Sequence, residues 1–232
     1  MTGIIGAMAV EVAEIIRRLE HPRTRTVARM DFTAGQLAGQ AVVVAVSGVG
    51  KVSAAMCAQV MISVYGVTRI LNTGVAGGLS PRLRTGDVVL ADALVQHDMD
   101  TTALGDPMGY LSGLGLVRLP VDPALLDALS AAARQLGLPV QVGTIATGDS
   151  FVHTDRQRQH ILTHFDALAC EMEGGAVAQV CYSNSVPCAV VRVISDTADA
   201  GAASDYQQFV HQAAARSISL LTAYLSHPPA SV

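Results

Sequence analysis

Short apolar runs that end at glycines alternate with longer segments rich in alanine and leucine along most of the chain. This alternation is typical of an α/β domain in which helices cover a largely buried sheet. Two β-prone runs, 32–37 and 41–46, flank a turn at Ala38-Gly39-Gln40, which predicts an antiparallel hairpin and departs from a purely parallel Rossmann pattern. Buried strands are expected at 3–8, 69–72, 87–91, 140–147 and 188–194.

Helices are expected at 10–19, 52–65, 122–136 and 204–225. The third is sharply delimited, because Asp122 is a good N-cap, Pro123 suits the first helical position and Gly137 ends the helix. We find no linker, repeat or low-complexity tract that divides the chain. The pattern therefore predicts one α/β domain over residues 1–226, followed by a short frayed tail, 227–232, that contains two prolines.

The chain of 232 residues is long enough to bury a substantial core, and half of its residues are hydrophobic while 15% are charged. That balance suits a compact enzyme rather than a disordered chain or a scaffold. The formal net charge of -4 leaves no basic excess that could neutralise a phosphate backbone. No nucleic-acid partner is therefore expected.

The N-terminus lacks the positive region and long apolar run of a signal peptide, and no apolar stretch is long enough to span a bilayer. We therefore expect a cytoplasmic protein without a membrane partner. The four cysteines, Cys57, Cys170, Cys181 and Cys188, form no CxxC pair and show no zinc-like spacing. They are expected to be reduced and buried.

Acidic residues follow two predicted strands at the points where open α/β sheets usually bind ligands, beyond the carboxyl ends of the strands. Glu11 follows the first strand, and Asp196 follows the strand at 188–194. Each has a structural alternative, because Glu11 could act on the helix dipole in a first turn and Asp196 could be an N-cap or loop residue. Both are candidate site residues with that alternative left open.

Glu171 and Glu173 flank Met172 directly after an apolar run. Side-chain alternation would place both carboxylates on the same side, although a solvated helix start would show the same pattern. Arg192 lies inside the apolar strand 188–194, where a cation is rarely buried without a carboxylate or a ligand beside it. We expect Arg192 to pair with one of the acids.

Three other motifs are similar to common cofactor sites but lack residues that those sites need. The run GVGKVS at 48–53 lacks the leading glycine of a Walker A loop and has valine where serine or threonine would bind magnesium. The run GVAGG at 74–78 does not fit GxGxxG, and we interpret it as a turn that lets a small ligand approach backbone amides. His97, Asp98 and Asp100 lie in one predicted loop without a recognised ligand pattern, which favours a structural loop. No cofactor and no metal are expected.

Eight motifs occur in a fixed order: GIIGAM at 3–8 with Glu11, SGVGKV at 47–52, NTGVAGGL at 72–79, GDVV at 86–89, His97-Asp98, TGDSF at 147–151, Glu171-Met172-Glu173 and VRVISD at 191–196. As an ordered set they resemble the 5′-methylthioadenosine/S-adenosylhomocysteine nucleosidases of the nucleoside phosphorylase superfamily, over about residues 3–224. The resemblance implies a single-domain three-layer α/β/α sandwich with a central mixed twisted β-sheet. It also implies an enzyme of methionine salvage and the activated methyl cycle, which uses water to hydrolyse the N-glycosidic bond of these adenine nucleosides.

By this resemblance Asp196 would protonate purine N7, Glu173 would bind the ribose hydroxyls and Glu11 would deprotonate the attacking water. Arg192 and Glu171 would help to place the water and orient Glu173. Adenine leaves poorly as an anion, so an acid at N7 lowers the barrier, and a carboxylate near the sugar stabilises the oxocarbenium charge. A base on the opposite face of the sugar orients the water and accepts its proton, as in inverting glycosidases.

The resemblance assigns further residues to substrate binding. Phe151 would stack on adenine and the Val152 backbone would read its hydrogen-bonding edge, with Ser195 nearby. For Met8 and Val49, core packing is a plain alternative. The remaining positions are Met172 beside the ribose, Met8, Val49, Leu104 and Tyr206 around the sugar and the 5′-alkylthio group, and Val75, Ala76 and Gly77.

Two positions depart from the family pattern, because Val75 stands where the bacterial enzymes commonly have serine and Leu104 where they often have an aromatic residue. Hydrogen bonding and packing of the 5′ group would differ accordingly, so substrate preference follows less directly than reaction type. The relatives are homodimers in which the loop around Leu104 helps to complete the partner's pocket. The resemblance therefore implies a homodimer.

Three alternatives are left open. Hydrolysis of 6-amino-6-deoxyfutalosine or futalosine in menaquinone synthesis would use the same adenine and ribose groups with a different 5′ substituent. A nucleoside phosphorylase would need a cationic phosphate site, and relatives of that kind carry an arginine in the N-terminal loop, which the run GAM at 6–8 does not offer. A noncatalytic nucleoside-binding protein would be expected to have lost Glu11, Glu173 or Asp196, yet all three are present.

Overall fold

The computed structural model describes residues 1–226, within which the chain forms ten strands and six α-helices. The strands are β1 (Thr2–Gly6), β2 (Glu20–Val27), β3 (Met30–Leu37), β4 (Gln40–Val46), β5 (Arg69–Gly78), β6 (Val88–Gln96), β7 (Leu119–Pro120), β8 (Val140–Thr147), β9 (Ala169–Glu171) and β10 (Cys188–Asp196). The helices are α1 (Ala9–Arg17), α2 (Lys51–Tyr65), α3 (Pro123–Gln135), α4 (Asp155–Phe165), α5 (Gly174–Ser183) and α6 (Ala202–Ser226), with a short 3-10 helix, η1 (Thr102–Leu104). The tail 227–232, which we expected to be frayed, lies outside the described residues.

All ten strands belong to one mixed sheet in the order β10-β6-β8-β9-β5-β1-β4-β3-β2, with β7 paired to β6. β1 runs parallel to β4 and β5, and β10 runs parallel to β5, whereas β2, β3 and β4 form an antiparallel meander. β5 also pairs with β9 through Gly77 and Gly78, so that β5, β10, β6, β8 and β9 close into a ring. The carboxyl ends of β1, β5 and β10 consequently point the same way.

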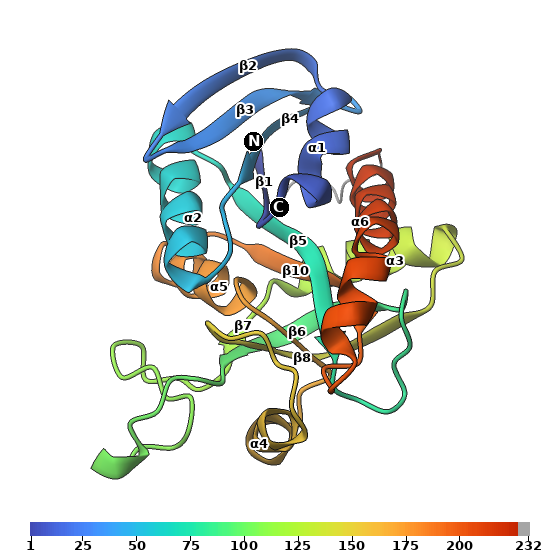
Figure 1. Cartoon of the computed structure of the whole chain (residues 1–232). Coiled ribbons are helices and arrows are strands. Elements are labelled where there is room, and N and C mark those ends of the chain that lie inside the picture. Colours follow the sequence, from blue (N-terminus) through green and yellow to red (C-terminus); the bar gives the residue numbers. More distant parts are fainter. Residues whose placement is uncertain (227–232) are drawn as a thin grey trace.

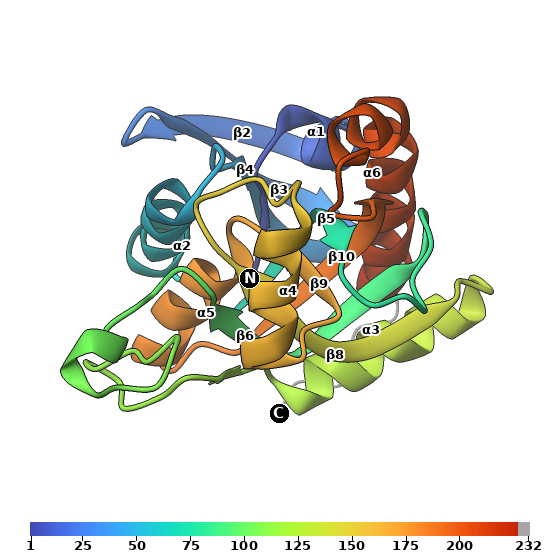
Figure 2. The same ribbon diagram turned by 60° about the horizontal axis from the view of Figure 1, so that its bottom comes forward.

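Helices cover both faces of the sheet, with α2 and α5 on one side and α1, α3 and α6 on the other (Figure 1 and Figure 2). The two larger cores form because alternate side chains of a strand point to opposite faces, and a third, smaller core lies beneath α4. In β1, Ile5 packs into the core with α2 and α5, whereas Ile4 packs into the core with α1, α3 and α6. The expected three-layer α/β/α sandwich with a central mixed sheet is confirmed.

Residues 97–118 connect β6 to β7 and extend away from the body of the molecule, as the green segment of Figure 1 and Figure 2 shows. This segment carries η1, where Leu104 is 82% exposed. A side chain of this kind on an extended segment is available to contact another molecule.

Several boundaries that the pattern predicted are confirmed. α3 begins after Asp122, whose side chain accepts a hydrogen bond from the Leu125 amide, and Gly137 follows its end with a φ of +64°. The hairpin of β3 and β4 turns at residues 38 and 39, as expected. Capping and turn residues therefore fixed these boundaries in the way that local chemistry predicts.

Several elements differ from the expectation, and the two-residue strand β7 is one that was not predicted. Residues 74–78 do not form a turn but are the second half of β5, because their backbone pairs with β9 and β10. β2 was not expected, since its side chains are exposed along nearly the whole strand and show no apolar alternation. α4 was also missed, although Thr154 caps it by accepting a hydrogen bond from the Gln157 amide.

The four cysteines are buried free thiols, as expected. Burial raises the pKa of the Cys57 thiol to about 12, so this group is protonated and unreactive at neutral pH. Among residues 1–226, no helix combines the length and the apolar character that crossing a membrane requires.

Candidate active site

A hollow of about 380 Å³ opens where β1, β5 and β10 end, which is a suitable size for a small organic ligand. A narrow extension of about 30 Å³ adjoins it and shares Phe151 and Met172 with it. The main hollow is lined by Ala7, Met8, Glu11, Val49, Val75, Phe151, Met172, Glu173, Ala203, Tyr206 and Gln207. The extension is lined by Gly77, Ser150, Phe151, Val152, Cys170, Glu171, Met172 and Asp196. Most of the predicted site residues are thus brought together.

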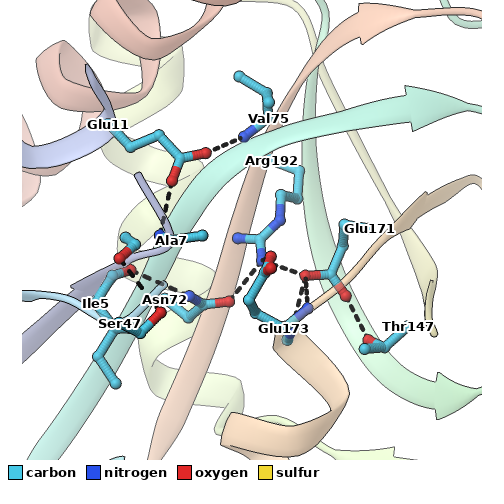
Figure 3. A network of polar contacts seen from close by, with 12 residues as sticks. Ile5, Ala7, Glu11, Ser47, Asn72, Val75, Thr147, Glu171, Glu173 and Arg192 are labelled. Carbon is cyan, nitrogen blue, oxygen red and sulfur yellow. Dashed lines mark hydrogen bonds and ion pairs between the residues drawn. The ribbon is translucent and has the colours of Figure 1, made fainter. Parts of the chain in front are cut away.

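Glu11 lies in the first turn of α1 with its carboxylate turned back toward the start of the helix. Its Oε2 accepts a hydrogen bond from the Ala7 amide at 2.7 Å, and its Oε1 accepts one from the Val75 amide at 3.1 Å (Figure 3). Oε2 also accepts one from the Met8 amide at 2.9 Å. Burial raises the pKa of Glu11, although the Arg192 charge and the three amides act in the opposite direction. Glu11 therefore interacts with the start of its own helix, as the structural alternative required, and also lines the hollow.

Arg192 is 1% exposed and is the cation around which the acids gather. Its Nη2 forms an ion pair with Oε2 of Glu171, lies 3.9 Å from Oε2 of Glu173, and donates to Oδ1 of Asn72 at 2.7 Å (Figure 3). The prediction that this arginine pairs with an acid is therefore confirmed. Its burial is tolerable because the charge is paired and hydrogen-bonded.

Glu171 is held by donors on both carboxylate oxygens. Besides the ion pair with Arg192, its Oε2 accepts hydrogen bonds from the amides of Glu173 at 3.0 Å and Gly174 at 2.7 Å. Its Oε1 accepts a hydrogen bond from the hydroxyl of Thr147, which in turn accepts one from the Gly175 amide at 2.7 Å. A carboxylate with this many donors is fixed in place, and its contacts are with neighbouring protein groups.

Glu173 is the N-cap residue of α5 and turns its carboxylate toward the hollow. Its Oε1 accepts a hydrogen bond from the Gly50 amide at 2.9 Å. Burial and the Glu171 charge raise the pKa of Glu173 to about 7, and Arg192 opposes this rise. At neutral pH the group consequently exchanges its proton readily, so it can accept or donate hydrogen bonds to a polar ligand.

Asp196 is the last residue of β10 and is 2% exposed. Its Oδ1 accepts a hydrogen bond from the Ala198 amide at 2.9 Å, and its Oδ2 accepts one from the Ser195 hydroxyl at 2.9 Å. Burial raises the pKa of Asp196 despite these two donors. A carboxyl group in this environment holds its proton more tightly than an exposed aspartate, which suits a general acid.

Two glycines of β5 leave the space that these acids occupy. A Cβ at position 74 would lie 2.5 Å from Oε1 of Glu11, and a Cβ at position 77 would lie 2.9 Å from Oδ1 of Asp196. The run at 74–78 thus gives close access to backbone, as we interpreted it, but it does so as a strand rather than as a turn.

Aromatic and sulfur groups form the remaining wall. The Tyr206 hydroxyl donates to Sδ of Met8 at 3.0 Å, and the ring of Tyr206 meets that of Phe151 edge-on with centroids 5.9 Å apart. Phe151 is 40% exposed, so its ring is free to contact a ligand. Leu104 lies on segment 97–118 outside this hollow, and the chain's own fold does not bring it to the site.

Sequence reasoning missed several residues of the site. Ala203 and Gln207 line the hollow from the first turns of α6, and Ala7 lines it beside Met8. Asn72 and Thr147, which hold Arg192 and Glu171, were not singled out. Thr147 ends an apolar strand, as Asp196 does, and the same signal could have identified it.

Asp98, in the loop around His97, contacts other protein groups, which agrees with the interpretation of a structural loop. Asp98 pairs with Lys51 at 2.7 Å and accepts a hydrogen bond from the Asp149 amide at 2.9 Å. Within the part of the chain that the structure describes, no group of three or more His, Cys, Asp or Glu side chains is arranged to hold a metal ion.

Comparisons with known proteins agree with one another. The model of the phosphorylase superfamily matches residues 2–226. A 5′-methylthioadenosine/S-adenosylhomocysteine nucleosidase from Shewanella sediminis is 40% identical over 225 residues, which cover 96% of this chain and 97% of the relative. An S-adenosylhomocysteine nucleosidase from Streptococcus pyogenes, solved in complex with 5-methylthiotubericidin, superposes with a TM-score of 0.95 at 36% identity, covering 99% of this chain and 97% of that one. A futalosine hydrolase of Helicobacter pylori superposes with a TM-score of 0.93 at 32% identity, covering 97% and 96%.

Proposed function

The chain belongs to the phosphorylase superfamily, and from this premise we propose that it hydrolyses the N-glycosidic bond of 5′-methylthioadenosine and S-adenosylhomocysteine, releasing adenine and the 5-alkylthioribose. The observation that carries the proposal is the placement of Glu11 and Glu173 around a hollow of about 380 Å³ and of Asp196 at a smaller hollow that adjoins it. The relatives named as nucleosidases match over nearly the whole chain, which supports the same reaction. The reaction belongs to methionine salvage and the activated methyl cycle.

Asp196 is the general acid in this proposal. Adenine is a poor leaving group as an anion, and a proton delivered to N7 lets it depart neutral. The raised pKa of Asp196 supports this role, because the group retains a proton nearer to neutral pH than an exposed aspartate would. The Ser195 hydroxyl donates to Oδ2 of Asp196 and orients this acid. Phe151 stacks on the adenine ring, and the backbone of Val152 contacts its edge, since both residues line the extension that contains Asp196.

Glu173 binds the ribose hydroxyls, and Met172 packs beside the sugar. Their support is that both line the main hollow and the Gly50 amide holds the carboxylate of Glu173 at its edge. As the glycosidic bond breaks, positive charge develops on the sugar, and the acids beside Arg192 leave the site with the negative potential that stabilises it. Glu171 neutralises Arg192, and it orients Glu173 by accepting a hydrogen bond from the Glu173 amide.

Glu11 is the base that deprotonates water. Three amides fix its carboxylate, so the water that it binds has a defined position, and this reduces the entropy that the attack must overcome. Its raised pKa makes it a stronger base than an exposed glutamate. The sugar and the 5′-alkylthio group are surrounded by Met8, Val49, Val75 and Tyr206. The adenine lies above the backbone of Ala76 and Gly77.

The proposal extends to a homodimer in the cytoplasm. Its support is the apolar surface that one chain leaves exposed, with Leu104 at 82%, Val52 at 70% and Met56 at 45%. Leu104 would complete the hollow of the partner, because its own chain places it elsewhere. Analytical ultracentrifugation is expected to give about twice the monomer mass of 24.1 kDa, and a monomer mass would contradict the dimer.

The four buried free thiols support the cytoplasmic location, because they suit a reducing compartment.

A futalosine-type nucleoside is the second candidate substrate. The superposition with a futalosine hydrolase favours it, and a different 5′ substituent would meet Val75, Ala203 and Gln207, which line the hollow. Such a substrate would leave the adenine and ribose contacts unchanged.

Substrate profiling tests these proposals. The purified full chain is incubated with methylthioadenosine, S-adenosylhomocysteine and aminodeoxyfutalosine, with and without phosphate, and the products are separated by liquid chromatography. We expect adenine release from the first two at a rate that phosphate does not change. Formation of a sugar 1-phosphate that requires phosphate would contradict the hydrolase assignment, and a strong preference for aminodeoxyfutalosine would contradict the substrate assignment.

A further inference from the structure

Lys51 of the run GVGKVS begins α2 and contacts the end of β6, the loop that follows β6 and the loop that follows β8. Its ammonium group donates to Oδ1 of Asp98 at 2.7 Å and to Oε1 of Gln96 at 3.3 Å. Its backbone amide donates to Oδ1 of Asp149 at 2.8 Å. The lysine of this motif therefore binds protein groups instead of a phosphate.

Asp98 completes a set of contacts among Lys51, Asp98 and Asp149, which we call the circuit. Its Oδ2 accepts a hydrogen bond from the Asp149 amide at 2.9 Å while its Oδ1 binds the ammonium of Lys51. Burial acts to raise the pKa of Asp98, but the hydrogen bonds from Lys51 and from the Asp149 amide lower it overall, so this group is ionised at neutral pH. One carboxylate thus ties the start of α2 to the loop that follows β8.

Asp149 supplies the capping carboxylate that the loop before α2 lacks. The N-cap position of α2 is Gly50, which has no side chain to accept from the first amides of the helix, and its φ is +99°. The carboxylate of Asp149 accepts from the Lys51 amide in its place, from a loop distant in sequence. A helix start that depends on a carboxylate from another loop moves when that loop moves.

The two loops joined in this way both line the nucleoside hollow. Val49 lines the hollow and Gly50 donates to Glu173, so the first loop sets the ribose wall. Phe151 and Val152 follow Asp149 directly after Ser150 and form the adenine wall. Lys51 and Asp149 line a different hollow of about 560 Å³ between α2 and α5, so they act from behind the site.

We propose that Lys51, Asp98 and Asp149 are positioning residues that set the spacing between the ribose wall and the adenine wall. The inference rests on the proposed nucleosidase function and adds residues that support its site without touching the substrate. Small shifts of binding groups reduce turnover strongly, because catalysis depends on near-attack geometry. Loss of the circuit will therefore weaken adenine binding and slow turnover together.

The test uses Asp98→Asn in the full chain. An amide has one acceptor oxygen, so it must turn its NH₂ group toward either Lys51 or the Asp149 amide, both of which are donors. We expect kcat/KM for methylthioadenosine to fall about 5-fold to 30-fold, with kcat decreased and the inhibition constant of adenine increased. Asp31→Asn is the matched control, because Asp31 accepts from the Thr26 hydroxyl at the exposed β2–β3 hairpin, and it is expected to leave all three constants unchanged.

A second comparison separates positioning from folding. Lys51→Met is expected to reproduce the loss, the double variant with Asp98→Asn is expected to lose little more, and Lys51→Arg is expected to restore most of the activity. Calorimetry of adenine binding measures the adenine wall without any turnover, so it tests the circuit even if methylthioadenosine is not the substrate. Absence of adenine release by the unsubstituted chain would count against the proposed function. Variants that melt at lower temperature but keep the original adenine affinity, kcat and KM would overturn the positioning role.

Discussion

Gly74 lies so close to the carboxylate of Glu11 that a Cβ at position 74 would be 2.5 Å from Oε1. The neighbouring amide of Val75 donates to the same oxygen at 3.1 Å. The bare backbone of β5 thus provides both the space and a hydrogen bond for the proposed base. Any side chain at position 74 has to move the carboxylate or the strand.

Gly74→Ala is therefore expected to abolish most turnover while the fold is retained. The added methyl group displaces the Glu11 carboxylate from its three amides, so the water loses its base, and kcat is expected to fall at least about 100-fold. Gly78→Ala is the control in the same strand, because the nearest atom to its Cβ would be Cγ2 of Ile194 at 3.3 Å. Steady-state adenine release and circular dichroism measure the outcome. Equal losses of activity in the two variants would show that the strand, and not Glu11, is affected.

Glu11→Gln is expected to lower kcat by about 10²-fold to 10⁴-fold, since glutamine cannot accept the proton of the water. Glu14→Gln on the same helix is the matched control, because Glu14 is paired with Arg17 and Arg18 at the surface. Asp196→Asn is expected to cause a loss similar to that of Glu11→Gln, because asparagine cannot protonate N7. Single-turnover adenine release checks all three variants. Turnover near the original rate in Glu11→Gln would remove Glu11 from the mechanism.

Glu173→Gln is expected to stabilise the protein more at pH 8 than at pH 5. The pKa of Glu173 is raised from its ordinary value of 4.5 to about 7, so the stability linked to its proton is present below pH 4.5 and is lost as the pH rises through about 7. Glutamine stays neutral and avoids this loss. Thermal unfolding at the two pH values is expected to show a gain of a few degrees that appears only at pH 8, where ~1 kcal/mol shifts Tm by about 2–4 °C. A gain of equal size at both pH values would contradict the raised pKa.

Thr147→Val is expected to reduce kcat/KM by about tenfold to a hundredfold, because the hydroxyl that holds Glu171 and caps the Gly175 amide is lost. Thr73→Val is a matched control in the neighbouring part of the sheet, where the hydroxyl bonds to Ser217 on α6 instead. Both variants leave a buried hydrogen-bond partner unsatisfied, so their melting temperatures are expected to fall by similar amounts. Equal kinetic constants in the two variants would show that Thr147 has no special influence on the site.

The sequence pattern predicted two acids of the candidate site for a physical reason. Glu11 and Asp196 follow apolar strands, and the carboxyl ends of β1 and β10 point to the same edge, so strand-end acids meet there. Arg192 was also predictable, since an arginine inside an apolar strand needs a carboxylate partner. In each case the signal is a charge in an apolar environment, which is visible without coordinates.

Other features depend on contacts between distant segments, and the pattern did not contain them. Residues 74–78 become a strand because β9 and β10 pair with them, whereas three glycines among five residues predict a turn by local preference. β2 is stabilised as a polar strand by pairing with β3, so its exposed side chains give no alternation. Asn72 lies inside β5 and is neutral, and neutral polar groups within strands are too common to identify as supports of a site.

The central position of β5 has a consequence for how the enzyme gains its activity. β1 and β10, which bring Glu11 and Asp196, come from opposite ends of the chain and both dock on β5. The site therefore exists only after the last long strand has joined the sheet, and such long-range pairings form slowly. During refolding, helix content will return before adenine release does, and a nascent chain that still lacks β10 will be inactive. Enzymatic activity in this protein thus reports that the whole sheet, including β10, has formed.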